Sequence, residues 1–242
     1  MALEAFSLYR VALSLKFFDT FSWIAYLFFM KVIVVGATGL VGNNIVKELL
    51  LDERVSKLLV FTRRSLEITH PKLEIKIVDF DHIDQWESEI KGDVLFSALG
   101  TTLRAAGSKE KQYLIDHDYQ HLIAQAAAQN GVKTYVLISS VNADPKSIFF
   151  YLRMKGELEE KVGHLPFQSV FILRPGPLVG KREKPRWTEQ MSTSFLKILP
   201  KALVSPGMKP ISGEQVAKVA VLKGLSPEVG IHVLGPRYLQ LP

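Results

Sequence analysis

The sequence predicts an α/β protein built on a doubly wound parallel sheet. From residue 31 onward, short apolar runs alternate with longer stretches in which apolar residues recur at helical spacing. This is the pattern of parallel strands joined by helices. The length fits such a fold, because 242 residues that are 48% hydrophobic and 22% charged can bury the core of one domain, or of one domain with a small lobe.

Six strands and a short seventh are expected along the chain. The first is almost entirely hydrophobic, as in a parallel strand that is buried on both faces. The third alternates, with Ile75 and Ile77 on either side of Lys76. The expected strands are 31–35, 58–62, 73–78, 93–99, 134–139, 169–173 and a last one near 231–234.

Helices are expected between these strands. Residues 40–51 carry an apolar stripe that includes Leu40, Ile45 and Leu49. Residues 112–130 predict one long helix, which ends at Asn130-Gly131, a favourable C-terminal cap. Further helices are expected at 149–162, near 188–199 and at 213–224, and a polar loop at 100–107.

The regular alternation loosens after Arg174-Pro175-Gly176. Ligands of open α/β sheets bind in the crevice beyond the carboxyl ends of the strands. We therefore expect one main domain at residues 30–242, in which residues 176–242 contribute a small C-terminal lobe over this crevice, on the substrate side.

Residues 1–29 form an N-terminal extension ahead of the first expected strand. Lys16 and Asp19 leave only residues 20–30 uncharged, about half of the roughly 20 residues that a membrane-spanning helix needs. The layout of a secretory signal peptide is also missing. Either Met30 is the natural start, or the extension is an amphipathic helix that rests on a surface or membrane. Neither interpretation predicts stable membrane insertion.

The net charge and the residue counts limit the ligands, the cellular location and the metal sites that can be expected. A net charge of +6 without a long basic run predicts no nucleic-acid binding, but suits a phosphorylated small ligand. The absence of cysteine excludes disulfides and thiol catalysis, and it fits a reducing cytosol, so we predict a cytoplasmic protein. His117 and His121 lie four residues apart without an evident third ligand, so we predict no metal site.

A glycine-rich turn follows the first strand and leads into a helix. Gly36 permits the tight turn, Gly39 lets the backbone approach a pyrophosphate, and Gly42 allows close helix–strand packing. The start of the helix offers free N–H groups to phosphates. This context predicts a Rossmann-type NAD(P) site, for which the turn comprises Gly36, Ala37, Thr38, Gly39, Leu40, Val41 and Gly42.

The end of the second strand indicates the type of cofactor. NAD sites usually place an acidic residue there, whereas this chain has Arg63 and Arg64. Arginine can pair with the 2′-phosphate of NADP, so we predict NADPH in preference to NADH. Asp79, after the third strand, is a candidate partner for the adenine amino group or else a helix cap. Backbone atoms of Ala98, Leu99 and Gly100, after the fourth strand, are also expected to line the cofactor.

A candidate catalytic pair lies on the helix after the fifth strand. Tyr151 and Lys155 are four residues apart, so they share one helix face. A tyrosine has an ordinary pKa near 10, and a nearby ammonium group is expected to lower it toward the range useful for proton transfer. Lys155 can also hold the nicotinamide ribose. A serine at the strand end, Ser139 or Ser140, can hydrogen-bond the substrate oxygen.

These motifs together resemble the short-chain dehydrogenase/reductase superfamily. The glycine turn, Ser139-Ser140, the Tyr151–Lys155 motif and Arg174-Pro175-Gly176 carry the resemblance, which covers about residues 30–235. Its spacing is similar to the extended and atypical branches, and residues 137–160 are similar to the oxidoreductase family that includes human Tat-interacting protein. The resemblance implies catalysis by Tyr151 and Lys155 with Ser140 rather than Ser139 as the third member, and a homodimer. It further implies that Ser139, Arg174, Pro175 and Gly176 lie at the cofactor.

The sequence therefore predicts an NADP-dependent oxidoreductase of the atypical short-chain type. The substrate would be a small carbonyl compound or alcohol, with hydride transfer coupled to a proton relay through Tyr151 and Lys155. Two alternatives stay open: a non-catalytic redox sensor that binds NADP(H), and a nucleotide-sugar epimerase or dehydratase that uses the same cofactor.

Overall fold

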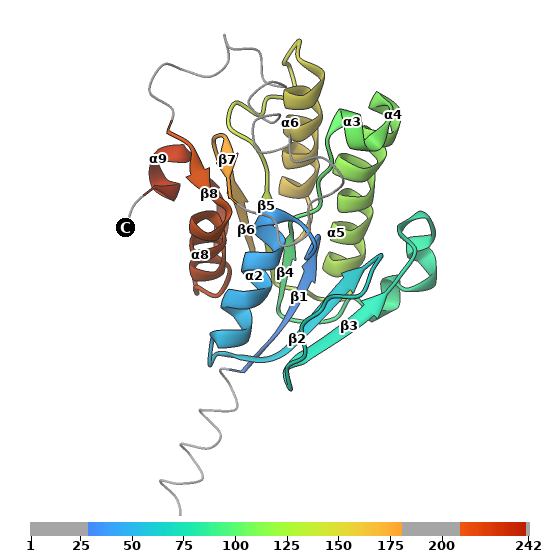
Figure 1. Cartoon of the computed structure of the whole chain (residues 1–242), viewed down its shortest axis with the longest axis vertical. Coiled ribbons are helices and arrows are strands. Elements are labelled where there is room, and N and C mark those ends of the chain that lie inside the picture. Colours follow the sequence, from blue (N-terminus) through green and yellow to red (C-terminus); the bar gives the residue numbers. More distant parts are fainter. Residues whose placement is uncertain (1–28, 181–208, 241–242) are drawn as a thin grey trace, which may run out of the picture.

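The computed structural model describes residues 29–180 and 209–240 of the chain. Figure 1 shows a twisted sheet between two layers of helices. The sheet has seven strands in the order β3-β2-β1-β4-β5-β6-β9, and every neighbouring pair is parallel. This confirms the predicted doubly wound parallel α/β fold. The strands are β1 (Met30–Val35), β2 (Val55–Thr62), β3 (Leu73–Ile77), β4 (Val94–Ser97), β5 (Thr134–Ile138), β6 (Ser169–Leu173) and β9 (Gly230–Leu234).

Helices cover both faces of the sheet (Figure 1). On the first face, α2 (Leu40–Leu51) packs against α8 (Gly213–Gly224). The second face carries α5 (Tyr119–Gln129) and α6 (Phe150–Gly163). Shorter helical segments are α3 (Leu103–Ala106), α4 (Lys109–Tyr113), α9 (Pro236–Leu239), the 3₁₀ turns η1 (Phe80–Gln85) and η2 (Glu87–Glu89), and the π-helical turn η3 (Leu114–Asp118).

Strand β1 belongs to both hydrophobic cores because its side chains alternate between the faces of the sheet. Val32 and Val34 lie in the core beneath α2 and α8. Ile33 and Val35 lie in the core beneath α5 and α6. All four are at most 1% exposed. The strand order reverses on either side of β1, so the crevice that the fold offers to a ligand opens beyond the carboxyl end of this strand.

The structure differs from the sequence prediction in the long helix at 112–130. This stretch is divided into α4, η3 and α5. The amide of Tyr119 donates to the carbonyl of Leu114, five residues earlier, which is the hydrogen bond of a π-turn. The expected loop at 100–107 also contains the short helix α3. Hydrophobic spacing could not reveal the extra residue of the π-turn, because both flanking segments keep their helical pattern.

The described part of the C-terminal region is joined to the main sheet. Strand β9 pairs with β6, and a small second sheet joins β7 (Leu178–Val179) to β8 (Ile211–Ser212). The helix predicted near 188–199 lies outside the described residues, as does most of residues 1–29, so the lobe and the extension stay predictions. Within residues 29–180 and 209–240, no helix has the length and apolarity needed to cross a membrane.

Helix α6 packs closely on the loop that leads from β5 to it. A Cβ atom at Gly156 would lie 2.2 Å from the backbone nitrogen of Pro145 and 2.3 Å from the carbonyl carbon of Asp144. The amide of Asp144 in turn donates to the carbonyl of Leu152 at 3.1 Å. Because Gly156 has no side chain, the helix can pack directly on the loop that precedes Tyr151.

We expect Gly156→Ala to lower the free energy of unfolding by about 1–3 kcal/mol, because the loop backbone must move to admit the methyl group. Gly163→Ala on the same helix is the matched control: its Cβ would meet only Ile231 Cδ1 at an ordinary 3.7 Å. Urea denaturation measures both changes. Equal stability of the two variants would contradict the packing argument.

Candidate functional site

The glycine turn brings β1, β4 and the start of α2 into contact. Gly36 has a φ of +84°, and a Cβ there would lie 2.3 Å from the carbonyl carbon of Ala98. The amide of Gly39 donates to the carbonyl of Gly36 at 2.9 Å. A Cβ at Gly42 would lie 2.2 Å from that same carbonyl oxygen. A side chain at any of these three glycines would therefore collide with backbone atoms or lie in very short contact with them.

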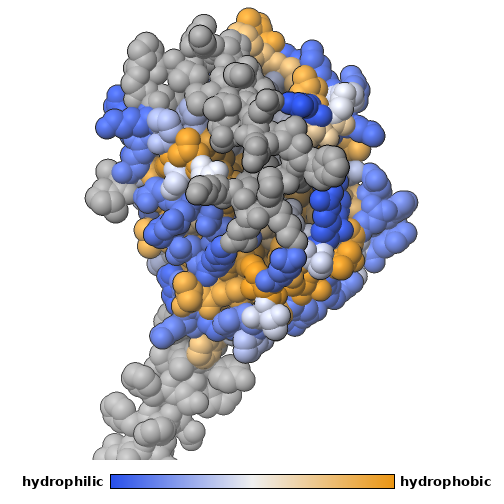
Figure 2. Space-filling view, viewed as in Figure 1, coloured by the Kyte–Doolittle hydropathy of each residue, from blue (hydrophilic) through white to orange (hydrophobic). Residues whose placement is uncertain are grey.

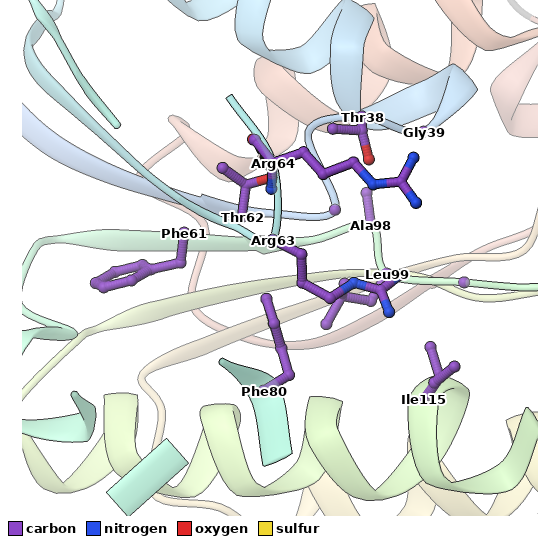
Figure 3. Close-up of a pocket in the computed structure, with 12 residues that line it drawn as sticks. Thr38, Gly39, Phe61, Thr62, Arg63, Arg64, Phe80, Ala98, Leu99 and Ile115 are labelled. Carbon is purple, nitrogen blue, oxygen red and sulfur yellow. Dashed lines mark hydrogen bonds between the residues drawn. The ribbon is translucent and has the colours of Figure 1, made fainter. Parts of the chain in front are cut away.

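A crevice opens beyond this turn. The space free of protein atoms there is ≈ 630 Å³, counting the part that is open to solvent. Residue Gly39 caps α2 without a side-chain hydrogen bond, so the N–H groups of the first turn are available to an anion. The crevice is lined by Gly36, Thr38, Gly39, Phe61, Thr62, Arg63, Arg64, Phe80, Ala98, Leu99, Gly100 and Ile115 (Figure 3).

The two arginines reach different parts of the crevice. Figure 3 shows the side chain of Arg64 pointing toward the turn at Thr38 and Gly39, whereas Arg63 extends toward Leu99. The hydroxyl of Thr62 donates to the carbonyl of Arg64 at 2.9 Å and accepts from its amide at 3.3 Å, which holds the backbone at this corner. Backbone amides, a threonine hydroxyl and two guanidinium groups together suit a phosphorylated dinucleotide.

Several residues predicted at the cofactor do not line the crevice. Ala37 and Val41 are 1% and 5% exposed and belong to the core beneath α2. Gly42 serves the packing of α2 on the turn, and Leu40 lies within 3.0 Å of the Cβ position of Gly180. Pro175 and Gly176 are buried, and the carbonyl of Pro175 accepts from the amide of Val141.

Asp79 is the cap of η1. Its carboxylate accepts from the amide of Asp81 at 3.0 Å and contacts His82 at 2.9 Å. These two hydrogen bonds lower the pKa of the Asp79 carboxyl. Of the two roles that the sequence left open for this residue, the structure shows the helix cap.

Ser139 and Arg174 are joined to Glu159 rather than exposed to the crevice. The guanidinium of Arg174 donates from Nε to Glu159 Oε2 at 3.0 Å and from Nη2 to the same oxygen at 2.5 Å. The hydroxyl of Ser139 donates to Glu159 Oε1. Glu159 is 6% exposed, so these contacts offset the cost of burying its charge. Sequence reasoning missed Glu159, although it follows Lys155 by four residues on the same helix.

Tyr151 and Ser140 meet at the end of β5. The Tyr151 side chain hydrogen-bonds that of Ser140, which lowers the pKa of the phenol. Burial has the larger effect and raises this pKa, and the negative charge of Asp116 raises it further. The pKa of Tyr151 is therefore raised rather than lowered as expected, first because the phenol is buried and second because the carboxylate of Asp116 lies close to it.

Lys155 is 3% exposed, and its ammonium nitrogen lies 4.0 Å from Asp116 Oδ2. The other carboxylate oxygen accepts from the amide of Thr101 at 2.6 Å. Asp116 is 1% exposed, and burial raises the pKa of its carboxyl to about 6 against the opposing effects of Lys155 and Thr101. The site therefore contains an acid–ammonium pair next to the tyrosine.

Asp116 lies in the π-turn η3, and a buried polar network holds it there. The side-chain amide of Gln120 donates to the Asp116 carbonyl at 2.6 Å, and the hydroxyl of Ser97 donates to Gln120 Oε1 at 2.7 Å. Ser97 and Gln120 are both fully buried. The network connects β4 to the carbonyl of the π-turn.

Sequence reasoning missed Asp116, but a signal for it was present. Gln112, Asp116 and Gln120 recur every four residues, and the same inner side of the helix carries Ile123 and Ala127. Polar residues in line with a buried apolar stripe indicate a buried network. The other missed residues, Phe61, Thr62, Phe80 and Ile115, line the crevice from strand and helix ends that only the fold brings together.

The surface near Tyr151, at the start of α6, is partly apolar. Ile148, in the loop between β5 and α6, is 85% exposed. Figure 2 shows apolar surface at this end of α6.

In the described part of the chain, no group of three or more side chains is placed to bind a metal ion together.

The fold and the glycine turn define a Rossmann-type α/β protein with a crevice beyond the turn. The chain belongs to the HIM1 family, whose model matches residues 72–206. It is 38% identical over 209 residues to "Protein fmp52, mitochondrial" of Emericella nidulans, covering 76% of this chain and 90% of that protein. The corresponding protein of Saccharomyces cerevisiae is 38% identical over 205 residues, covering 79% and 86%.

Solved structures share the fold at low sequence identity. The chain superposes on "MoeE5 in complex with UDP-glucuronic acid and NAD" with a TM-score of 0.65 and 20% identity, covering 85% of this chain and 75% of the other. A UDP-N-acetylglucosamine 4-epimerase from Methanobrevibacter ruminantium gives a TM-score of 0.63 and 18% identity, covering 85% and 76%. At this level of identity the superpositions show a shared Rossmann-type α/β fold. The narrower likeness to the family of human Tat-interacting protein stays a prediction.

The predicted cytoplasmic location is wrong by these comparisons, because the relatives from four fungi are named mitochondrial. The prediction rested on the absence of cysteines and of a secretory signal peptide. Neither observation bears on import into mitochondria, whose targeting segments follow other sequence rules.

The buried contact between Arg174 and Glu159 gives a test of its structural role. We expect Arg174→Met to lower the free energy of unfolding by about 2 kcal/mol or more, less than for a fully buried pair because Arg174 keeps partial exposure. Adding Glu159→Met should recover part of that loss by removing the unpaired carboxylate. Denaturation of both variants measures this, and NADPH affinity should change little. A large loss of affinity with unchanged stability would place Arg174 at the cofactor instead.

The raised pKa of Asp116 gives a pH-dependent stability. The folded state holds this proton up to about pH 6, whereas the unfolded chain loses it near the ordinary value of 3.8. The contribution therefore favours folding at low pH and is lost as the pH rises through 6. Relative to Asp116→Asn, the wild type should lose stability over this window by at most about 1.4 kcal/mol per pH unit. Urea denaturation at a series of pH values measures the difference, and a constant difference would refute the shift.

Proposed function

We propose that the protein is an oxidoreductase that uses NADP(H) and acts on a small carbonyl compound or alcohol. One observation carries the proposal: Tyr151 hydrogen-bonds Ser140 beside Lys155, at the carboxyl edge of the parallel sheet where the glycine turn after β1 also lies. When bound there, a nicotinamide dinucleotide supplies or accepts the hydride. Proton transfer to or from the substrate oxygen falls to the residues of the chain.

The proposed roles follow from the contacts. Ser140 orients the substrate oxygen, and the hydroxyl of Tyr151 exchanges a proton with it. Lys155 lies one helical turn after Tyr151 and places a positive charge below the reacting oxygen. The exposed side chain of Ile148, three residues before Tyr151, supports a substrate with an apolar portion. The names of the fungal relatives support a mitochondrial location.

The preference for NADP rests on the arginines. Arg64 points toward Thr38 at the phosphate-binding turn, and Arg63 lines the same crevice. Within the described lining, no carboxylate stands where a ribose-binding acid of an NAD site would be expected. MoeE5 was solved with NAD, so a preference for NADP would distinguish this chain from that protein.

The first test is a fluorescence titration of the full chain with NADPH and with NADH. We expect tighter binding of NADPH, and a loss of about tenfold to a hundredfold in NADPH affinity in Arg64→Ala, because a charged hydrogen bond to phosphate contributes about 1.5–3 kcal/mol. Arg237→Ala, an exposed arginine on α9, is the matched control and should bind normally. Equal binding of both cofactors would overturn the NADP preference, and no binding would overturn the proposed function.

A screen of carbonyl substrates with NADPH tests the chemistry. We expect Tyr151→Phe to retain NADPH binding and to lose turnover by at least about a hundredfold, because it removes the proton that the substrate oxygen needs. A redox sensor without catalysis would instead bind NADPH, turn over no carbonyl compound and be insensitive to Tyr151→Phe. That result would favour the sensor.

A further inference from the structure

The buried pair of Asp116 and Lys155 changes the electrostatics of the proposed proton relay. An ammonium group alone would favour the phenolate of Tyr151. Here the carboxylate of Asp116 lies 4.0 Å from that ammonium, and both groups are almost fully buried. Low exposure means that water screens neither charge, so the two fields at Tyr151 largely offset each other.

We propose that Asp116 is a positioning residue that neutralises Lys155 and keeps Tyr151 in its protonated form, which prepares the site to donate a proton to a substrate oxygen. The inference rests on the proposed oxidoreductase function. In this step the O–H bond of Tyr151 breaks, and its proton bonds to the oxygen that gains negative charge on reduction. The electron pair stays on the phenol oxygen, and the phenolate then recovers a proton from solvent.

The fixed position of Asp116 supports this role. The Thr101 amide holds Oδ1 at 2.6 Å, which leaves Oδ2 facing Lys155. Gln120 holds the carbonyl of the same residue, and Ser97 holds Gln120. Contacts from the loop after β4 and from the helix therefore hold the carboxylate in place near Lys155. A flexible acid on the surface could not offset the charge of Lys155 at Tyr151 to a constant degree.

The groups around the pair can be assigned element by element. Helix α6 contributes Lys155 and Tyr151, the loop after β4 contributes the neutral amide of Thr101, and the end of β5 contributes the neutral Ser140. A second cluster of titratable groups lies on the neighbouring helical turns, and its members contact one another: Tyr113, His117, Asp118, Glu157 and Arg153. Burial raises the pKa of Tyr151, and the charge of Asp116 acts in the same direction.

The test measures the titration of Tyr151 without any substrate. Ultraviolet difference titration of the full chain, with Tyr151→Phe subtracted, isolates this phenol from the other tyrosines. We expect Asp116→Asn to lower the pKa of Tyr151 by about one unit or more, because the positive charge of Lys155 is then unopposed. Asp116→Glu, which keeps the charge, should leave the titration closer to that of the wild type.

Two outcomes decide the inference. A lowered pKa in Asp116→Asn that Asp116→Glu restores supports it, and an unchanged pKa in Asp116→Asn overturns it. If Asp116→Asn does not fold, Asp116→Ser is titrated instead, with the same expected shift and the same overturning result. Once a substrate is identified, the oxidation reaction of Asp116→Asn should reach its maximum at a pH about one unit lower than in the wild type.

This experiment is independent of the proposed function. Failure of the chain to bind NADPH or to turn over a carbonyl compound removes the oxidoreductase, whatever the titration shows. If binding and turnover are normal but the pKa of Tyr151 is unchanged in Asp116→Asn, only the role proposed for Asp116 is overturned. The two failures are therefore distinguishable.

Discussion

The contact between Gly36 and Ala98 is the constraint on which the crevice depends. The carboxyl ends of β1 and β4 approach so closely that a single Cβ at Gly36 would overlap the backbone of Ala98. This approach lets the chain turn at Gly39 into α2, and it places Leu99 and Gly100 on the opposite wall. The arginines after β2 line the same crevice (Figure 3). Without the contact between Gly36 and Ala98 the sheet could persist, but the crevice would lose this shape.

A second constraint operates below the crevice, where charge is buried. Two acids, Glu159 and Asp116, are taken out of water on neighbouring helices and each meets a cation. Glu159 has strong donors from Arg174 and Ser139 and acts as a structural anchor between α6 and β6. Asp116 has a weaker contact with Lys155, at 4.0 Å, and its pKa is raised to about 6. Because its donors are close, Glu159 makes a stabilising contact. The weaker contact of Asp116 leaves a carboxyl whose protonation can respond to its surroundings.

The fold and half of the site could be predicted from the sequence, because both rest on local patterns. Buried strands such as 31–35 and 169–173 are continuous apolar runs, and the glycine turn and the Tyr151–Lys155 spacing are visible in short stretches. The remaining features depend on side chains that meet across the fold. Ser139 faces Glu159 instead of the crevice, and nothing in the local pattern indicates which of two adjacent serines points inward. The partner of Lys155 lies 39 residues earlier, in a turn whose hydrogen bonding has no hydrophobic signature.

The extra residue in the π-turn also sets the rotational phase between α4 and α5. In a regular helix each residue advances by about 100°, so removing one residue from 114–118 would restore regular winding but rotate everything upstream by that angle relative to α5. Ile123 and Ala127 would keep their places beneath the sheet, while the contact of Tyr113 with Glu157 on α6 would be lost. The π-turn thus sets the side of α4 that faces α6 independently of the side of α5 that faces the core. Substitutions on one of these two surfaces can therefore occur without disturbing the other.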